Sequence, residues 1–388
     1  MMRRMFLKCL PGAMIPLPLA LPGCAKETSD TRFTKVDHLL SEAVARHEIP
    51  GVVAAIGQGD IVLHRAVFGQ RALVPATEPM TWDTRFDMAS LTKATVTAPA
   101  IMQFWEQGRL ELDDPVSHYL PEFAQNGKQA ITIRQLLTHY SGLAPDLDLS
   151  TPWSGKEEAF RRAMAAVPTG PTGVHFVYSD INFIVLGLLV EHLSDLPLNI
   201  YAERHILTPI GMKHSGFLPS PLLRPIIAPT QYDDAHVPLR GVVHDPTAHR
   251  MGGVAGHAGL FSDADDMTLY AASFLDRRAG RSSLYPLRTE TVRLMTSPQS
   301  PGTSDVRGLG WDIATHYSTP RGDIFPVGSF GHTGYTGTSL WMDPDSAAFI
   351  LILTNRVHPL DANGKAIVRL RHDVATAAAL ALNLPQAR

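Results

Sequence analysis

Apolar, β-rich segments lie near both ends of this 388-residue chain, and a long block of mostly helical patterns separates them. The early pair is Gly51 to Gln58 and Ile61 to Gly69, joined by a two-residue Gly-Asp link that predicts a hairpin turn. Later strands are predicted at Ile324 to Val327, Thr338 to Met342 and Ala347 to Thr354, and the last is apolar enough to be buried on both faces. One sheet must therefore be assembled from distant parts of the chain.

Helical periodicity surrounds these strands and fills the centre of the chain. Val36 to Val44 predicts an amphipathic helix before the first strand, and the alanine-rich Lys365 to Leu382 predicts another after the last. The central block shows helical segments at Ile101 to Gly108, Ile133 to Leu137 and Ile184 to Leu193, without a clear strand ladder.

We therefore expect an α+β fold, an α/β/α sandwich in which an antiparallel sheet is flanked by helices and carries an inserted all-helical lobe. The α/β lobe is expected at about residues 31–95 and 265–388, and the helical lobe at about 96–264. A ligand would bind in the cleft between the two lobes.

The composition excludes one class of partner. The net charge is −3 and the charged residues are scattered, so no basic stripe is present that would favour nucleic-acid binding. Cys9 and Cys24 are the only cysteines, and we expect a mature chain without an internal disulfide.

The first 24 residues read as an export signal rather than as part of the fold. Arg3 and Arg4 precede an uncharged apolar segment, an order that resembles the twin-arginine export signature. Leu21-Pro22-Gly23-Cys24 resembles a bacterial lipobox, with Cys24 as the lipidated residue that anchors the protein to a membrane. The alternative is ordinary cleavage after Ala25 and release as a soluble protein. Either reading predicts a periplasmic or cell-envelope location.

Three short stretches contain candidate reactive groups. In DMASLTKA, Ser90 and Lys93 lie three residues apart at a predicted helix start, where a hydroxyl and an amine would share one face. The second stretch is Tyr178-Ser179-Asp180, just before an apolar helix. The third is Gly331-His332-Thr333-Gly334-Tyr335-Thr336-Gly337, which by itself could be a glycine-rich turn.

In this order, the three stretches resemble the serine β-lactamase and penicillin-recognising enzyme family, closest to its class C and D-alanyl-D-alanine peptidase branch. LELDDPVSHYLP, ITIRQLLTHYSGL and AGHAGLFS also look like segments of that family. The resemblance implies the sandwich fold described above, with the helical lobe facing the active site.

The resemblance also implies roles for single residues. Ser90 would attack an acyl carbonyl, Lys93 would take its proton, and Tyr178 would pass a proton to the leaving group. Backbone N–H groups of Ser90 and Tyr335 would hold the oxyanion, with Gly334 and Gly337 keeping that backbone in place. Asp180, His332, Thr333, Gly334 and Tyr335 make up the expected substrate-binding and oxyanion set.

Two residues depart from the family pattern. His332 stands where most β-lactamases have lysine, and a largely neutral imidazole holds a substrate carboxylate less firmly than an ammonium group does. Asp180 stands where penicillin-binding members have asparagine, and an ionised carboxylate cannot donate a hydrogen bond. If Asp180 contacts Lys93, the pKa of the lysine rises by about 1 to 3 units and Tyr178 becomes the better general base.

No cofactor and no metal is expected. His236, His244, His249 and His257 fit no familiar ligand spacing, and the glycines around them indicate a tight loop instead. Pro99 removes a backbone donor from the helix that begins near Ser90 and should bend it locally.

The sequence thus predicts an exported serine hydrolase that acts through an acyl-enzyme on Ser90. A D-alanyl-D-alanine carboxypeptidase-like enzyme acting on a cell-wall peptide or related amide is the first choice, a carboxylesterase the second and a weak β-lactamase the third. A catalytically inert envelope scaffold of the same fold is the alternative from another class, and covalent labelling by a phosphonate would distinguish the two.

Overall fold

The central sheet joins the two ends of the chain. The computed structural model describes residues 31–302, 304–361 and 364–385, and the lipidation candidate Cys24 lies outside them. Within that part of the chain, an eight-stranded sheet has the order β3-β2-β1-β10-β9-β8-β7-β6, and every pairing in it is antiparallel. A second, two-stranded sheet pairs β4 with β5. The α+β class expected from the sequence is confirmed.

The strands are β1 (Gly51–Gln58), β2 (Ile61–Ala72), β3 (Glu78–Pro79), β4 (Phe86–Asp87), β5 (Phe261–Ser262), β6 (Val306–Arg307), β7 (Asp312–Ala314), β8 (Phe330–Thr333), β9 (Ser339–Asp343) and β10 (Ala348–Thr354). The α-helices are α1 (Thr34–Ala45), α2 (Ala98–Glu106), α3 (Ile133–Leu137), α4 (Lys156–Ala165), α5 (Asp180–Ser194), α6 (Leu198–Ala202), α7 (Thr208–Ile210), α8 (Pro246–Arg250), α9 (Ala264–Ala279), α10 (Thr289–Met295) and α11 (Gly364–Ala381). Short 3₁₀ and π-helical segments lie between them.

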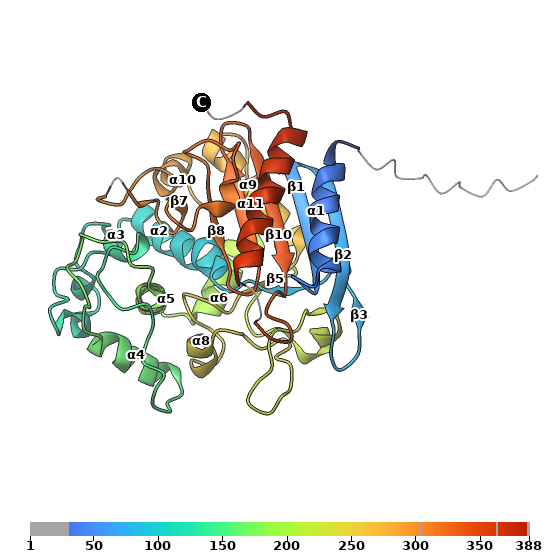
Figure 1. The fold of residues 1–388 in the computed structure, drawn as a ribbon. Helices are drawn as coiled ribbons and strands as arrows, with labels where there is room; N and C mark the ends of the chain where they lie inside the picture. The colour runs from blue at the N-terminus through green and yellow to red at the C-terminus, as the bar shows by residue number, and fades with distance from the viewer. Residues whose placement is uncertain (1–30, 303, 362–363, 386–388) are drawn as a thin grey trace, which may run out of the picture. The chain divides into compact units, whose positions relative to one another are not determined.

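Both faces of the sheet are covered by helices. Successive side chains of a strand point to opposite faces, so each strand contributes to two core clusters. Val52, Ala54 and Ile56 of β1 pack with α1 and α11, which lie side by side on one face (Figure 1). Val53 and Ala55 belong to the other core cluster, which includes residues of α9 and the helical block. The same alternation runs through β10, whose seven residues are all buried, as its apolar sequence predicted.

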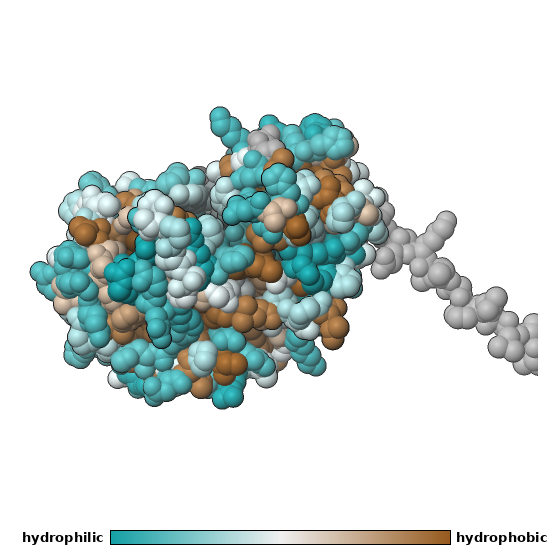
Figure 2. Space-filling view, turned by 90° about the horizontal axis from the view of Figure 1, so that it is seen from below, coloured by the Kyte–Doolittle hydropathy of each residue, from teal (hydrophilic) through white to brown (hydrophobic). Residues whose placement is uncertain are grey.

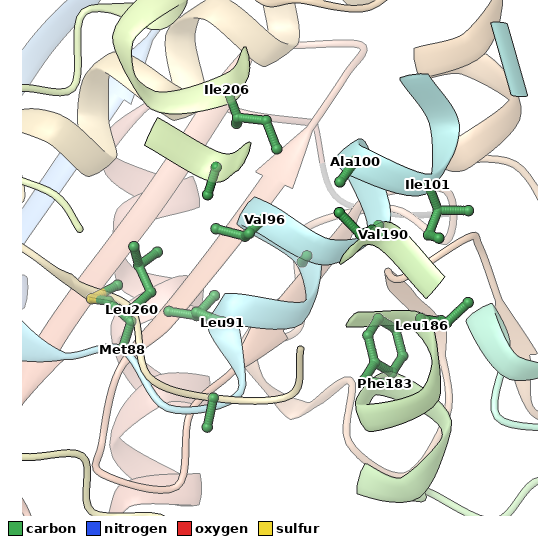
Figure 3. Packing of buried hydrophobic residues seen from close by; sticks show 14 of the residues in the cluster. Met88, Leu91, Val96, Ala100, Ile101, Phe183, Leu186, Val190, Ile206 and Leu260 are labelled. Atoms are coloured by element: carbon green, nitrogen blue, oxygen red, sulfur yellow. The ribbon is translucent and has the colours of Figure 1, made fainter. Parts of the chain in front are cut away.

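The helical block between β4 and β5 is built around α5. Ten consecutive residues of α5, from Ile181 to Val190, are buried, so this helix is surrounded on all sides. Figure 3 shows its Phe183, Leu186 and Val190 near the segment that bears Leu91 and Val96. The segment around Ser90 is thereby held by the core itself.

Most of the predicted elements are confirmed, but one strand is wrong. Ile324 to Val327 does not pair along a ladder: it forms a turn after a 3₁₀ segment, and the strand begins only at Phe330. Ile324 and Phe325 are buried in the cluster with α1 and α11, and this burial accounts for the apolar pattern of the segment. Burial without ladder pairing gives the same sequence pattern as a short strand, which explains the error.

The helices of the described residues are short or polar relative to a membrane span. No single helix there is long and apolar enough to cross a bilayer. On the face shown in Figure 2, apolar residues lie interspersed among polar ones.

The lobe boundaries expected from the sequence stay a prediction.

Candidate active site

Ser90 follows a backbone turn that is fixed by a buried carboxylate. Asp87 accepts hydrogen bonds from the backbone N–H groups of Ala89 (2.9 Å) and His244 (2.7 Å), one on each oxygen. Ala89 has a φ of 48°, which is uncommon for a residue with a side chain. Burial raises the pKa of Asp87 to about 6, although both N–H donors favour the charged form. The two bonds therefore set the turn that presents Ser90.

The helix after Ser90 begins with an irregular turn. Lys93–Thr97 is a π-helical segment, in which the N–H of Ala98 bonds to the carbonyl of Lys93, and regular α-helix starts at Ala98. Pro99 is the second residue of that α-helix, which continues directly from the π-helical segment. Near Pro99, where a local bend was expected, the structure has a π-helical turn at Lys93–Thr97, just before the proline.

Lys93 is completely buried beneath Ser90. Its Nζ donates hydrogen bonds to Ser90 Oγ (2.8 Å) and to the carbonyl oxygen of His257 (3.0 Å). Its third close contact is an ion pair of 2.6 Å with Asp180 Oδ1. Burial alone would lower the pKa of Lys93, but the adjacent Asp180 carboxylate raises it well above the ordinary lysine value. Lys93 is therefore an ammonium group whose donors all have partners.

A glycine contact brings the His257 carbonyl to Lys93. A Cβ on Gly256 would lie 2.0 Å from the carbonyl oxygen of Phe183, so only glycine lets this loop approach α5 so closely. The His257 ring bonds to Asp245 at 2.8 Å, and the Asp245 charge raises the pKa of His257 against the opposing effect of burial. The glycines near the four histidines do form a loop, and His257 anchors it.

Tyr178 lies beside this pair, held by an aromatic stack. Its ring stacks on His139 at 4.4 Å, and the backbone N–H of Ser179 donates to Nδ1 of the same histidine (3.1 Å). Burial raises the pKa of Tyr178, while Lys93 and a hydrogen bond with Ser90 oppose that rise. Tyr178 is therefore a neutral phenol in contact with both Ser90 and Lys93.

The β8–β9 turn is tied directly to the Ser90 segment. Thr336 Oγ1 donates to the carbonyl of Asp87 (2.8 Å), and Thr338 Oγ1 donates to the carbonyl of Met88 (3.0 Å). A Cβ on Gly334 would lie 2.6 Å from the Met88 carbonyl oxygen, so a larger residue would push the two segments apart. This close approach places the backbone around Tyr335 next to Ser90, where the oxyanion site was expected.

Arg371 of α11 supports that turn from behind. Its Nη2 donates to the carbonyls of Gly334 (2.9 Å) and Thr338 (2.8 Å), and the side chain is buried. One guanidinium group thus fixes both ends of the turn that contains Tyr335.

His332 presents a lone pair rather than a charge. Burial, together with the nearby Arg307 and Lys93, lowers the pKa of His332 well below its ordinary value. Its Nδ1 lies 2.9 Å from the carbonyl of Thr333, a contact that requires Nδ1 to carry the proton. The buried Nε2 has no partner among the described residues and is left as an acceptor. The neutral imidazole expected from the sequence is what the site contains.

These groups line one cavity of about 750 Å³. Among the residues that the structure describes, every expected site residue except Lys93 is part of its lining, and Lys93 contacts Ser90 from behind. The lining residues are Ser90, Tyr178, Asp180, His332, Thr333, Gly334 and Tyr335. Asp180 opens α5, where a negative charge is favoured by the helix dipole. The structure therefore brings together residues from all three stretches.

Four contributors were not singled out from the sequence, namely Asp87, His139, Arg307 and Arg371. Asp87 and His139 lie inside the quoted stretches DMASLTKA and ITIRQLLTHYSGL, so a signal for them was present. Arg307 and Arg371 lie far from any of the three stretches, and their side chains line the cavity only in the folded chain.

Potential metal ligands occur together at one place among the described residues, where His214, Asp263 and Asp266 are close to one another. Asp263 accepts the N–H of Asp266 as the N-cap of α9, and Asp266 accepts the N–H of His214 (2.7 Å). Both carboxylates thus have structural partners.

The sequence matches the model of the Beta-lactamase family over residues 36–374. It is 31% identical over 370 residues to the N-acetylmuramyl-L-alanine amidase of Bacillus subtilis (strain 168), covering 85% of this chain and 82% of that protein. It is 33% identical over 318 residues to a protein of Salmonella schwarzengrund (strain CVM19633) named "Putative D-alanyl-D-alanine carboxypeptidase", covering 74% of this chain and 72% of the relative.

Solved structures share the fold. The hydrolase EstCE1, described as having promiscuous acyltransferase activity, superposes with a TM-score of 0.70 at 23% identity, covering 89% of this chain and 98% of that one. A class C β-lactamase from Rhodobacter sphaeroides gives a TM-score of 0.69 at 18% identity, covering 88% and 99%.

Proposed function

This chain belongs to the β-lactamase family of serine hydrolases, and from that premise we propose that it hydrolyses D-alanyl peptides or a related cell-wall amide through an acyl-enzyme on Ser90. The observation that carries the proposal is the contact of Ser90 Oγ with both Lys93 and Tyr178 at the wall of a 750 Å³ cavity. A hydroxyl placed between a cation and a phenol is poised as a nucleophile.

Acylation can proceed without a free amine. Ser90 Oγ attacks the carbonyl carbon while its proton passes to Tyr178 Oη, and the phenolic proton of Tyr178 passes to the leaving nitrogen as the C–N bond breaks. Lys93 remains an ammonium group, because its ion pair with the Asp180 carboxylate raises the lysine pKa. The positive charge of Lys93 then stabilises the negative charge that develops on Ser90 and Tyr178. Water then attacks the acyl-enzyme, and the proton transfers run in reverse.

The oxyanion would be held by the backbone N–H groups of Ser90 and Tyr335. Removing one such donor typically costs about 3 to 4 kcal/mol of transition-state stabilisation. The ties from Thr336, Thr338 and Arg371 support this assignment, because they restrain the backbone on both sides of the site.

The order of substrates rests on the names of two relatives and on the charges in the site. Amides of the cell wall come first, because the names of two relatives, an amidase and a carboxypeptidase, point to such bonds. Carboxylic esters come second, because the neutral His332 makes no demand for a charged substrate. β-Lactams come third, because Asp180 is committed to Lys93 and cannot donate to a substrate amide as asparagine would.

We propose export and a lipid anchor on Cys24 as the cellular setting, since the arginine pair and the lipobox-like LPGC precede the folded domain. A Cys24→Ala variant is expected to leave the membrane fraction. Continued membrane attachment of that variant would rule the anchor out.

The catalytic proposal is tested with purified protein on three substrates: a D-alanyl-D-alanine peptide, a short-chain ester and a chromogenic cephalosporin. We expect the peptide to be the best substrate by kcat/KM. A Ser90→Ala variant should lose activity on all three and should no longer be labelled by a fluorescent phosphonate. Undiminished hydrolysis by that variant would contradict the acyl-enzyme.

A further inference from the structure

We propose that Arg307 forms an anion-binding subsite on the leaving-group side of the cavity and selects substrates whose leaving group bears a carboxylate. The inference deepens the proposed function and rests on it, because a D-alanine leaving group with a free C-terminus has that chemistry. It names the group that recognises the carboxylate, a role that the neutral His332 cannot fill.

Arg307 is a buried cation with unused donors. Its side chain is 1% exposed, and its Nε and Nη2 have no hydrogen-bond partner among the described residues. Buried guanidinium donors are normally paired, because leaving a charged donor unsatisfied costs free energy. The backbone of β6 holds the residue in place, since its N–H bonds to Ser300 Oγ and its carbonyl accepts from Gln299 (2.8 Å).

The anion nearest to Arg307 does not satisfy it. Asp312 Oδ1 lies 3.6 Å from Nη1, beyond normal hydrogen-bond distance, and Asp312 Oδ2 is engaged by Ser318 Oγ at 2.9 Å. Other cations of the cavity are better matched: Lys93 has Asp180 at 2.6 Å, and Arg356 is paired with Asp361. Arg371 also lines the cavity with its Nε unpartnered, but its Nη2 is occupied by the carbonyls of Gly334 and Thr338. Arg307 differs in that two adjacent donors, Nε and Nη2, lack a partner among the described residues.

The position of Arg307 assigns the subsite to the leaving group. Its guanidinium carbon lies 5.6 Å from the centre of the Phe176 ring, and Phe176 contacts Tyr317, which in turn packs against Tyr178 at 5.4 Å. Arg307 lines the same cavity as Ser90 and Tyr178. This aromatic path connects Arg307 to Tyr178, the group that returns a proton to the leaving atom in the proposed mechanism, and on this ground we assign an anion held by Arg307 to the leaving fragment.

A guanidinium group suits a carboxylate in particular. Its two adjacent free donors, Nε–H and Nη2–H, have the geometry of a bidentate pair with the two oxygens of a carboxylate. His332, which lines the same cavity, presents the lone pair of Nε2 and would repel a carboxylate, so the arginine is the better partner for it.

The test uses two esters that differ by one carboxylate group on the leaving group, phenyl acetate and 3-acetoxybenzoate. The wild-type enzyme is expected to prefer 3-acetoxybenzoate by kcat/KM. The variant to compare is the double substitution Arg307→Met with Asp312→Asn, in which the second change removes the Asp312 carboxylate that would otherwise lose its cation. In this variant we expect kcat/KM for 3-acetoxybenzoate to fall by about 10- to 150-fold. Any loss on phenyl acetate should be much smaller, so the ratio of kcat/KM for the two esters should fall.

Arg307→Lys and a matched control complete the design. The lysine variant keeps the charge without the fork, and we expect an intermediate loss on 3-acetoxybenzoate. Arg278 also lies over a phenylalanine ring, at 5.9 Å from Phe330, but does not line the cavity, so Arg278→Met should leave the ratio of the two esters unchanged. If the double variant does not fold, the wild-type ratio still decides: an enzyme indifferent to the leaving-group carboxylate overturns the proposal.

The two proposals can fail separately. If D-alanyl peptides are not cleaved but the ester pair is discriminated through Arg307, the subsite stands and the peptide substrate is wrong. If a D-alanyl-D-alanine peptide and its C-terminal amide are cleaved equally well, and the double variant affects both esters alike, the peptidase function stands and the subsite is refuted.

Discussion

Asp180→Asn is the substitution that most directly tests the chemistry of this site, because it removes the charge that keeps Lys93 protonated. The carboxylate lies 2.6 Å from Nζ, the lysine is fully buried, and the Asp180 side chain is 21% exposed. At that distance and an effective dielectric constant of about 20, the attraction has an upper value of about 6 kcal/mol. A single opposite charge generally shifts a pKa by about 1 to 3 units, or about 1.4 to 4 kcal/mol.

The variant should therefore show a new alkaline limb. Burial still lowers the pKa of Lys93 when Asp180 is gone, so it should fall below the ordinary lysine value of about 10.4. The ammonium form is the active one in the proposed mechanism, so activity is present below this pKa and lost as pH rises through it. Wild-type enzyme should lack that limb, because its Lys93 pKa is raised.

The assay is kcat/KM for a neutral ester, measured between about pH 6 and pH 11. Asp180→Asn should be slower at neutral pH and lose further activity on the alkaline side. Asp195→Asn provides the control, since Asp195 ends the same helix, is exposed and does not line the cavity. A rise in neutral-pH activity in Asp180→Asn, with activity growing as pH increases, would refute the reasoning and make neutral Lys93 the general base.

The remaining predictions concern the groups around Ser90. Tyr178→Phe should lower kcat by at least 10²-fold, the usual contribution of acid–base transfer, with little change in melting temperature; near-normal turnover in pre-steady-state assays would exclude Tyr178 as the shuttle. Arg371→Met should lower kcat more than it raises KM, because the turn bearing Gly334 loses its support, and Arg371→Lys should restore part of the rate; equal changes in kcat and KM would argue against a positioning role. Asp87→Asn should destabilise the protein by about 1 to 3 kcal/mol, because an amide offers one acceptor for the two N–H groups that Asp87 holds; unchanged thermal unfolding would contradict this account.

Much of the fold could be predicted because it depends on local patterns. The continuous apolar runs of β1 and β10 and the helical period of α1 and α11 reflect which side chains are buried, and each pattern is complete within one segment. The turn at Ile324 and Phe325 was misread for the same reason, since burial alone does not say whether a backbone pairs along a ladder.

The members of the site could be listed in advance, but their states could not. The order of DMASLTKA, YSD and GHTGYTG was enough to indicate a serine hydrolase of the β-lactamase family and to single out Ser90, Lys93 and Tyr178. Whether Asp180 faces the substrate or Lys93 was left open, and the answer decides which group can accept the serine proton.

The sequence by itself thus determined the family, the layered fold and the identity of the reactive groups, since these depend on short motifs and on periodicity. Only the tertiary structure decided the charge on Lys93, the lone pair on His332 and the presence of Arg307 in the cavity. The physical reason is that protonation and pairing depend on distances through space and on burial. Those quantities arise when residues far apart in the chain pack against one another.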